Sequence, residues 1–114
     1  MDNEGDEQLL DPARPLDLAS MVEYQSGSTV SRELAKTSGG TVTLFAFDSG
    51  QGLSEHTAPF DALVLILDGQ GQLTIGGETV EPDEGELVLM PADVPHSLQA
   101  EQRFKMLLIM LRGD

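Results

Sequence analysis

The two histidines of this sequence, His56 and His96, are the side chains best suited to chemistry near neutral pH. Imidazole acts as a general acid or base, ligates a metal through a ring nitrogen, or hydrogen-bonds a small ligand. A histidine also serves as a structural side chain that is hydrogen-bonded within a barrel wall. Because the chain has no third histidine, the functional question is whether these two rings share one site.

The composition and the local patterns exclude several other chemistries. The chain has no cysteine, which excludes disulfides, thiolate metal sites and thiol nucleophiles and is typical of a reducing cytoplasm. No Gly-x-Ser-x-Gly segment marks a serine hydrolase, and neither histidine has the spacing of a catalytic triad. The glycines at 69, 71, 76 and 77 are not followed by a helical pattern, so they predict turns rather than phosphate-binding loops.

The charge balance is strongly acidic, with 6 Lys and Arg against 20 Asp and Glu and a formal net charge of -14. The cations are scattered singly, whereas phosphate binding needs clustered cations, so nucleic acid and anionic membranes are not expected partners. The acidic N-terminal residues lack the basic and apolar regions of a secretory signal. The longest apolar runs, 62–67 and 106–111, are far shorter than the about 20 residues of a membrane span, so we expect a soluble, cytoplasmic protein.

Acidic residues and prolines dominate residues 1–15, so we expect a mobile acidic tail followed by a single domain over residues 16–114. Residues 16–22 fit either a helical turn or a short strand. Beyond them, short segments rich in β-branched and large apolar residues predict strands. These segments are 29–35, 41–47, 62–67, 72–75, 86–90, 96–100 and 104–111.

Turns that contain glycine separate the expected strands, and Gly76-Gly77 between residues 73–75 and 78–80 is the clearest two-residue hairpin. Roughly eight to ten short strands with no helical period predict an all-β sandwich or barrel. Much of the buried surface is expected from large apolar side chains of two segments. These side chains are Leu63, Val64, Leu65, Ile66, Leu67, Val88 and Met90.

Two stretches of the sequence resemble the conserved motifs of the cupin superfamily. The first cupin motif spaces a glycine, two histidines, a glutamate and a closing glycine at fixed intervals, and the second spaces a glycine, a proline and a histidine. The corresponding positions in this chain are Gly50, His56, Ala58, Ala62 and Gly69, followed by Gly85, Pro91 and His96, with Asp93 where the second motif often has a glycine. The resemblance covers about residues 40–112 and is to small, RmlC-like cupins with a conserved barrel.

The resemblance implies a double-stranded β-helix, or jelly-roll barrel, in which both motifs face one cavity. In cupins the two histidines and the glutamate of the first motif bind a divalent metal together with the histidine of the second. This chain retains His56 and His96 and has Ala58 and Ala62 in place of the other two ligands. Because two imidazoles hold a metal only weakly, no cofactor is predicted beyond a weakly held divalent metal.

Three carboxylates near the motifs are candidate oxygen ligands. Glu55 and Asp61 lie one residue out of phase with the inward positions of a regular strand, and only a bulge would bring one of them inside. Asp93 stands within the second motif. One alternative function is therefore a metal-dependent oxygenase or isomerase that uses His56, His96 and one of these carboxylates. The enzyme alternative also has a metal-free form, in which a histidine acts as general base.

The preferred hypothesis is a binding module that holds a small organic ligand between His56 and His96. Alanine at 58 and 62 removes two large side chains, and an apolar cavity with few polar groups is the usual form of a small-molecule site. Phe47 and Met106 are expected to line this cavity. Neighbours at alternate positions of the same two strands are further candidates, namely Phe45, Phe104, Leu108 and Met110.

A scaffold that acts through its protein contacts is the third hypothesis. The resemblance also implies a homodimer, which fits a chain with possible edge strands to cover. Residues 16–29 lie outside both motifs and are the segment expected to contribute to that dimer.

Overall fold

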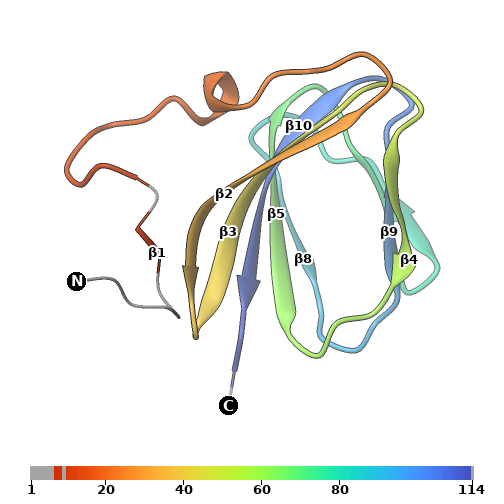
Figure 1. The fold of residues 1–114 in the computed structure, drawn as a ribbon. Helices are drawn as coiled ribbons and strands as arrows, with labels where there is room; N and C mark the ends of the chain where they lie inside the picture. Colours follow the sequence, from red (N-terminus) through yellow and green to blue (C-terminus); the bar gives the residue numbers. More distant parts are fainter. Residues whose placement is uncertain (1–6, 9, 114) are drawn as a thin grey trace.

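The structure is a computed structural model that describes residues 7–8 and 10–113, and its strands form two antiparallel sheets. The six-stranded sheet has the order β1 (Glu7–Gln8), β2 (Thr29–Thr37), β3 (Gly40–Phe47), β10 (Phe104–Leu111), β5 (Asp61–Asp68) and β8 (Leu87–Met90). The four-stranded sheet has the order β4 (Gly52–His56), β9 (His96–Gln99), β6 (Gln72–Ile75) and β7 (Glu78–Val80). Figure 1 shows the two sheets facing each other, which confirms the predicted all-β jelly roll.

Most strands form where the sequence predicts them, because the apolar segments are separated by residues that tolerate a positive φ. Gly76 and Gly77 have φ values of 58° and 85° and join β6 to β7 in the predicted hairpin. The ambiguous segment 16–22 holds a short 3-10 helix, η1 (Leu18–Met21). Strand β4 was not predicted, because its sequence GLSEH has a single large apolar residue and is mostly exposed.

The main core lies between the two sheets and follows the two-residue period of the strands. On β5 the side chains of Ala62, Val64 and Ile66 point between the sheets and are 5%, 0% and 1% exposed. The leucines between them, at 63, 65 and 67, therefore point to the opposite face of the six-stranded sheet. Of the side chains expected to supply much of the buried surface, Val64, Ile66 and Met90 are buried, whereas the leucines at 63, 65 and 67 and Val88 are only partly buried.

A second buried cluster lies on the outer face of the six-stranded sheet, under the N-terminal segment. Val22 is buried there against Leu44 and Leu107, and Leu18 and Met21 of η1 pack against the same cluster. Two cations fasten the segment by hydrogen bonds to its carbonyl groups. Lys105 Nζ donates to the Ala19 carbonyl oxygen at 2.6 Å, and Arg32 Nη1 donates to the Met21 carbonyl oxygen at 3.1 Å.

Tyr24 completes the attachment of this segment. Its hydroxyl donates to Asp68 Oδ2 at 2.6 Å, and its ring lies 4.6 Å from the Arg103 guanidinium carbon. Burial raises the pKa of Tyr24, and the hydrogen bond to Asp68 and that residue's charge raise it further, against a smaller opposite effect of Arg103. The phenol therefore stays protonated and remains a donor to Asp68 at neutral pH.

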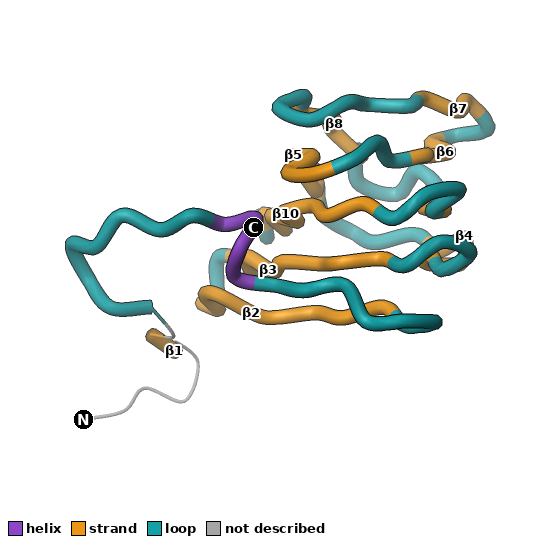
Figure 2. The backbone as a smooth tube through the Cα atoms, turned by 90° about the horizontal axis from the view of Figure 1, so that it is seen from above, coloured by secondary structure: helices purple, strands orange, loops and turns teal. Residues whose placement is uncertain are grey.

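The expected acidic tail, residues 1–15, is described only in part, since residues 1–6 and 9 lie outside the described residues. Glu7 and Gln8 form β1, which pairs with Lys36 and Ala35 of β2. Figure 2 shows the chain from β1 to η1 running to one side of the stacked strands. Over the described residues, no helix is both long and apolar enough to cross a membrane.

Candidate functional site

The two histidines meet across neighbouring strands of the four-stranded sheet. His56 ends β4 and His96 begins β9, and the two residues are direct partners in the antiparallel register. Their ring centroids lie 4.3 Å apart at an interplanar angle of 71°, and the two Nε2 atoms are 3.1 Å apart. The expectation that both imidazoles approach one point is met by this geometry.

A local irregularity in β4 turns His56 toward the barrel interior. The register with β9 shifts between Leu53 and His56, although both residues line the same pocket. Residues three apart on a regular strand point to opposite faces, so the extra residue in β4 is what places both side chains on the inner face. The irregularity does not bring Glu55 inside, because Glu55 is not among the residues that line the pocket.

Hydrogen bonds to the backbone set the tautomer of each neutral ring. His56 Nδ1 donates to the Ser54 carbonyl oxygen at 2.8 Å, and His96 Nδ1 donates to the Val94 carbonyl oxygen at 3.2 Å. A carbonyl oxygen can only accept, so each neutral ring carries its proton on Nδ1 and a lone pair on Nε2. In the neutral pair the two Nε2 lone pairs therefore point toward each other, and no proton lies between them.

The two rings differ in their exposure to water. His96 is 5% exposed, whereas His56 is exposed and lies at the mouth of the pocket. Burial lowers the pKa of His96; the hydrogen bond to Val94 raises it, and the nearby His56 lowers it. The net direction is downward, so the buried ring favours its neutral form, in which Nε2 is an acceptor.

Beneath the imidazole pair lies a small cavity of about 40 Å³. Its lining is apolar apart from the two rings and consists of Leu53, His56, Ala58, Ala62, Met90, His96, Leu98, Met106, Leu108 and Met110. Ala58 and Ala62 thus border the space next to the histidines, as the sequence suggested. One water needs about 10–15 Å³ by this measure, and drug-sized ligands fill sites of about 300–1,000 Å³, so the cavity accommodates only a few atoms.

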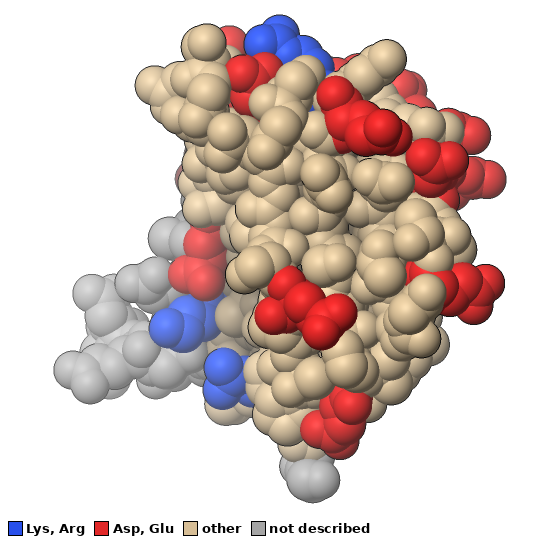
Figure 3. Space-filling view, turned by 90° about the vertical axis from the view of Figure 1, so that its right-hand side faces the viewer, with Lys and Arg blue, Asp and Glu red and all other residues tan. Residues whose placement is uncertain are grey.

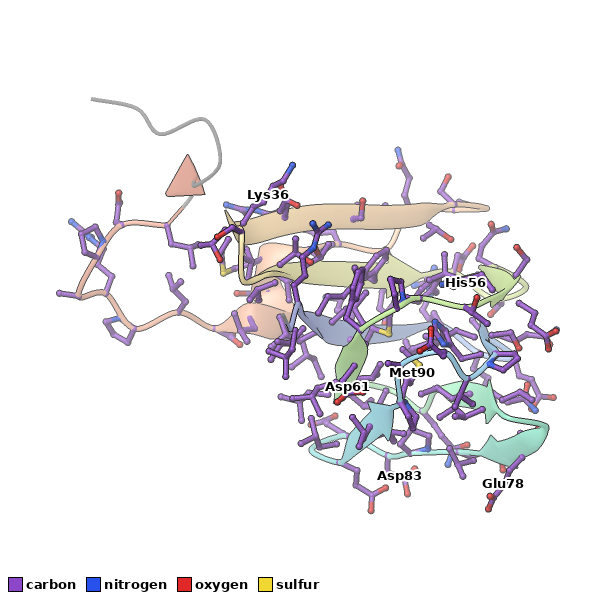
Figure 4. The ribbon with its side chains drawn as sticks, turned by 90° about the horizontal axis from the view of Figure 1, so that it is seen from below. Lys36, His56, Asp61, Glu78, Asp83 and Met90 are labelled. Carbon is purple, nitrogen blue, oxygen red and sulfur yellow. The ribbon has the colours of Figure 1, made fainter. Side chains whose placement is uncertain are left out.

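A row of three side chains from the six-stranded sheet lies opposite the histidines. Met110 on β10 pairs with Ala62 on β5, and Ala62 pairs with Met90 on β8. The small alanine is therefore flanked by two thioethers that border the same cavity. Figure 4 views the barrel from the end at which His56 and Met90 lie, on strands of opposite sheets.

Several lining residues were not singled out by the sequence. Leu53 and Leu98 are cross-strand partners on β4 and β9, and Met90 was expected only as a core residue. Alternation from His96 would have found Leu98, which lies two residues further along the same strand. Leu53 can be assigned to the lining only from the irregular register of β4, and Met90 only from its pairing with Ala62.

Phe47 is not among the residues that line this cavity, although Met106 is. The Phe47 ring is fully buried and stacks on Phe45 and Phe104, with centroids 5.6 Å and 4.9 Å away. Phe47 and Phe104 belong to the main core, and Phe45 packs against it. We therefore leave Phe47 out of the site that we propose below.

The carboxylates considered as metal ligands do not join the imidazole pair. Asp61 Oδ1 accepts a hydrogen bond from the Ala92 amide at 2.8 Å, and Asp93 is an exposed turn residue with φ of 64°. Within residues 7–8 and 10–113, no group of three or more His, Cys, Asp or Glu side chains is arranged to hold a metal. The donors present do not fit a centre of three histidines and one carboxylate.

A larger hollow of about 520 Å³ lies on the outer face of the four-stranded sheet and is distinct from the imidazole pocket. Its lining is mostly hydroxyl and amide side chains, including Ser54, Thr74, Ser97 and Gln99. Figure 3 shows acidic side chains spread over this side of the molecule, and basic side chains near its borders. The distribution gives nucleic acid no basic surface on this face.

Comparison with known proteins places this architecture in a family. Residues 38–114 match the model of the AraC-like ligand binding domain. A conserved protein of unknown function from Streptococcus pyogenes is 36% identical with a TM-score of 0.87, and the match covers 93% of each chain. A cupin superfamily protein from Desulfitobacterium hafniense is 32% identical with a TM-score of 0.85, over 92% of this chain and 96% of that one.

A cupin 2 conserved barrel domain protein from Leptotrichia buccalis is 41% identical with a TM-score of 0.80. That match covers 82% of this chain and 46% of the Leptotrichia chain. No protein of curated function matches the sequence. The two facing sheets, the two motifs and these matches show that the chain belongs to the cupin superfamily, as a small conserved-barrel protein with an AraC-like ligand binding domain.

Proposed function

We propose that this cupin binds a small organic molecule at the cavity bordered by His56, His96, Ala58 and Ala62. The observation that carries the proposal is the pair of Nε2 atoms, 3.1 Å apart, above an apolar cavity. Two acceptors at one end and an apolar surface at the other define a site for an amphipathic molecule. The family match to a ligand binding domain supports the same conclusion.

The chemistry of the pair favours a ligand that donates a hydrogen bond. A hydroxyl or a neutral carboxylic acid can donate its proton to one Nε2, whereas a second acceptor group would meet two lone pairs. The cavity of about 40 Å³ admits a short apolar group such as a methyl or ethyl. The remainder of the ligand then lies outward beside His56, the exposed member of the pair.

Binding without catalysis is the function that the arrangement supports best. The metal-dependent form of the enzymatic alternative needs a carboxylate beside the imidazole pair, and Asp61 instead accepts a hydrogen bond from the backbone of the 91–95 loop. Glu55 is exposed outside the pocket. The two Nε2 atoms still offer two adjacent acceptors that would hold a bound ligand. A cytoplasmic location remains a prediction from composition.

The double substitution His56→Ala and His96→Ala tests the proposal. In a thermal-shift screen of short alcohols, phenols and carboxylic acids in metal-free buffer, we expect at least one compound to raise the Tm of the native chain. At 100 times its Kd, such a ligand stabilises by about 2.7 kcal/mol. The double variant should lose this shift and lose no more than about 2 kcal/mol of its own stability, because both Nδ1 bonds are local.

Gln99→Ala is the matched control, since Gln99 lies on β9 with His96 but faces the outer side. It should retain the ligand-induced shift. Ala62→Leu fills the cavity and keeps both histidines in the chain, and it should lose the shift, so it reports on the site even if the double variant folds poorly. Ligand binding that survives both Ala62→Leu and the double substitution would place the site elsewhere.

We also propose that the chain forms a homodimer through the uncovered part of the six-stranded sheet. Leu87 and Leu89 on the edge strand β8 are 58% and 52% exposed, and Leu111 on β10 is 48% exposed. In the register, Leu87 pairs with Leu65 and Leu89 with Leu63, so these side chains share the outer face. The apolar face therefore continues past the part covered by the N-terminal segment.

A second copy is the occupant that fits this surface. An unpaired edge strand with exposed leucines invites pairing, and a two-fold axis lets identical patches cover each other. Residues 16–29, expected to form the dimer, contain Val22, which is buried against its own sheet. We therefore place the interface at β8 and the adjoining face of β5.

Leu87→Glu with Leu89→Glu should convert a dimer to a monomer in sedimentation equilibrium at micromolar concentration. Each buried carboxylate would lack a partner in the interface, whereas in the monomer both side chains are solvent-exposed. Leu16→Glu is the control, because Leu16 is 42% exposed on the N-terminal segment and belongs to neither β5 nor β8. A native chain that sediments as a monomer would contradict the proposal.

A further inference from the structure

The spacing of the two Nε2 atoms is that of two neighbouring ligands on one metal ion. Metal–nitrogen bonds of about 2.0–2.1 Å and angles between 90° and 110° bring two ligand nitrogens to about 2.8–3.4 Å from each other. The observed separation of His56 Nε2 and His96 Nε2 is 3.1 Å. Metal-binding histidines also donate the other ring N–H to a backbone carbonyl or carboxylate, as both rings do here.

The other donors around the cavity are soft. Met90, Met106 and Met110 all line it, which is three of the five methionines in the chain. Met90 and Met110 flank Ala62 on adjacent strands and line the same cavity as the imidazole pair. None of the ten lining residues is a carboxylate. A hard cation that prefers oxygen therefore finds no ligand in this lining.

We propose that this cavity binds one Cu(I) ion, through His56 Nε2, His96 Nε2 and a thioether sulfur of Met90 or Met110. Thioethers select Cu(I) over divalent cations, and imidazole nitrogen suits copper in general. The cavity of about 40 Å³ has room for one ion and a few further atoms. The inference concerns the pocket of the proposed function but does not rest on the binding of an organic ligand.

The burial of the donors also favours this ion. His96 is 5% exposed, Met90 2% and Met106 0%, so the cavity is largely shielded from water. A monovalent ion loses less hydration energy than a divalent one when it enters such a site, because the cost of burying a charge rises steeply with that charge. His56, at the mouth, is the exposed ligand and marks the entry path.

The test is an anaerobic titration of the purified chain with Cu(I), in ascorbate and against a chromophoric Cu(I) chelator. We expect the native chain to take one equivalent from the chelator and X-ray absorption to show both nitrogen and sulfur neighbours of copper. Met90→Leu with Met110→Leu keeps the volume and the imidazoles but removes both flanking sulfurs. This variant should bind Cu(I) at least about 100-fold more weakly and should show no copper–sulfur scattering.

Met21→Leu is the matched control, because Met21 packs against the second cluster on the outer face and should leave Cu(I) affinity unchanged. Retention of native Cu(I) affinity by the Met90 and Met110 variant would overturn the inference. Failure of the native chain to compete with the chelator, or tighter binding of Zn²⁺ than of Cu(I), would overturn it as well.

The thermal-shift screen in metal-free buffer separates the two proposals. An organic ligand that binds the native chain and the Met90→Leu, Met110→Leu variant alike, in a chain that takes up no Cu(I), would overturn the copper site and leave the proposed function standing. Cu(I) uptake that requires the thioethers, in a chain that no organic compound stabilises, would support the copper site and contradict the proposed function.

Discussion

Ala58→His combined with Ala62→Glu is expected to give the chain a divalent-metal site that binds Zn²⁺ or Ni²⁺ at least about 100-fold more tightly than the native chain. Both alanines border the cavity onto which the two histidines face, so both new side chains enter the space beside the Nε2 atoms. Four protein donors then replace two. The new set matches the ligands that cupins use at these motif positions.

Calorimetric titration with Zn²⁺ checks this expectation, with a stoichiometry of one metal per chain as the predicted result. Ala58→Gln with Ala62→Gln is the control, because it adds comparable volume but no imidazole or carboxylate. The metal-free double variant should be less stable than the native chain, because two large side chains overfill a cavity of about 40 Å³ and glutamate is placed in apolar surroundings. Zn²⁺ should recover part of that loss. Equal Zn²⁺ affinities of the variant and the control would show that positions 58 and 62 do not face the imidazole pair.

Phe104→Ala should lower the free energy of unfolding by about 3–5 kcal/mol, the largest stability effect that we expect from a single substitution. Phe104 is fully buried at the start of β10, and its ring stacks on Phe47 at a centroid distance of 4.9 Å. The truncation leaves a void between the two sheets, and the neighbouring strands are held in register by β10 on both sides. The surroundings therefore relax little into the void.

Urea unfolding at a fixed protein concentration measures this loss. Phe60→Ala is a control of the same residue type, because Phe60 is only partly buried and lies 5.3 Å from the Arg112 guanidinium carbon. Its loss should be about 1 kcal/mol, the value of a single exposed cation–π contact with modest burial. Equal losses from the two substitutions would mean that Phe104 does not have the central place in the core assigned to it.

Local pattern was sufficient for most of the fold. The apolar segments became β3, β5, β6, β8, β9 and β10 because each carries large side chains at alternate positions between turn residues. The pattern failed for β4, whose polar, exposed sequence Gly52–His56 forms a strand only because β9 pairs with it. It also could not show which leucines of 63–67 would be covered, since that depends on where the N-terminal segment packs.

For the candidate site, motif spacing alone predicts that His56, His96, Ala58 and Ala62 lie together. The other features of the site depend on pairing between strands that are distant in the sequence. Met90 borders the cavity because β8 pairs with β5, a contact that no local period reports. The inward turn of His56 depends on the irregular register of β4, and a sequence pattern cannot distinguish that from a regular strand.

The place of β10 in the six-stranded sheet has a consequence for the chain during its synthesis. Strand β10 lies between β3 and β5 and is made after both of them. At about 5–20 residues per second, a ribosome leaves the facing edges of β3 and β5 without their partner for some seconds. A nascent chain that stops before Phe104 therefore exposes two strand edges with unpaired backbone groups that can pair with other chains. We expect chaperones that recognise extended apolar segments to bind it until β10 has emerged.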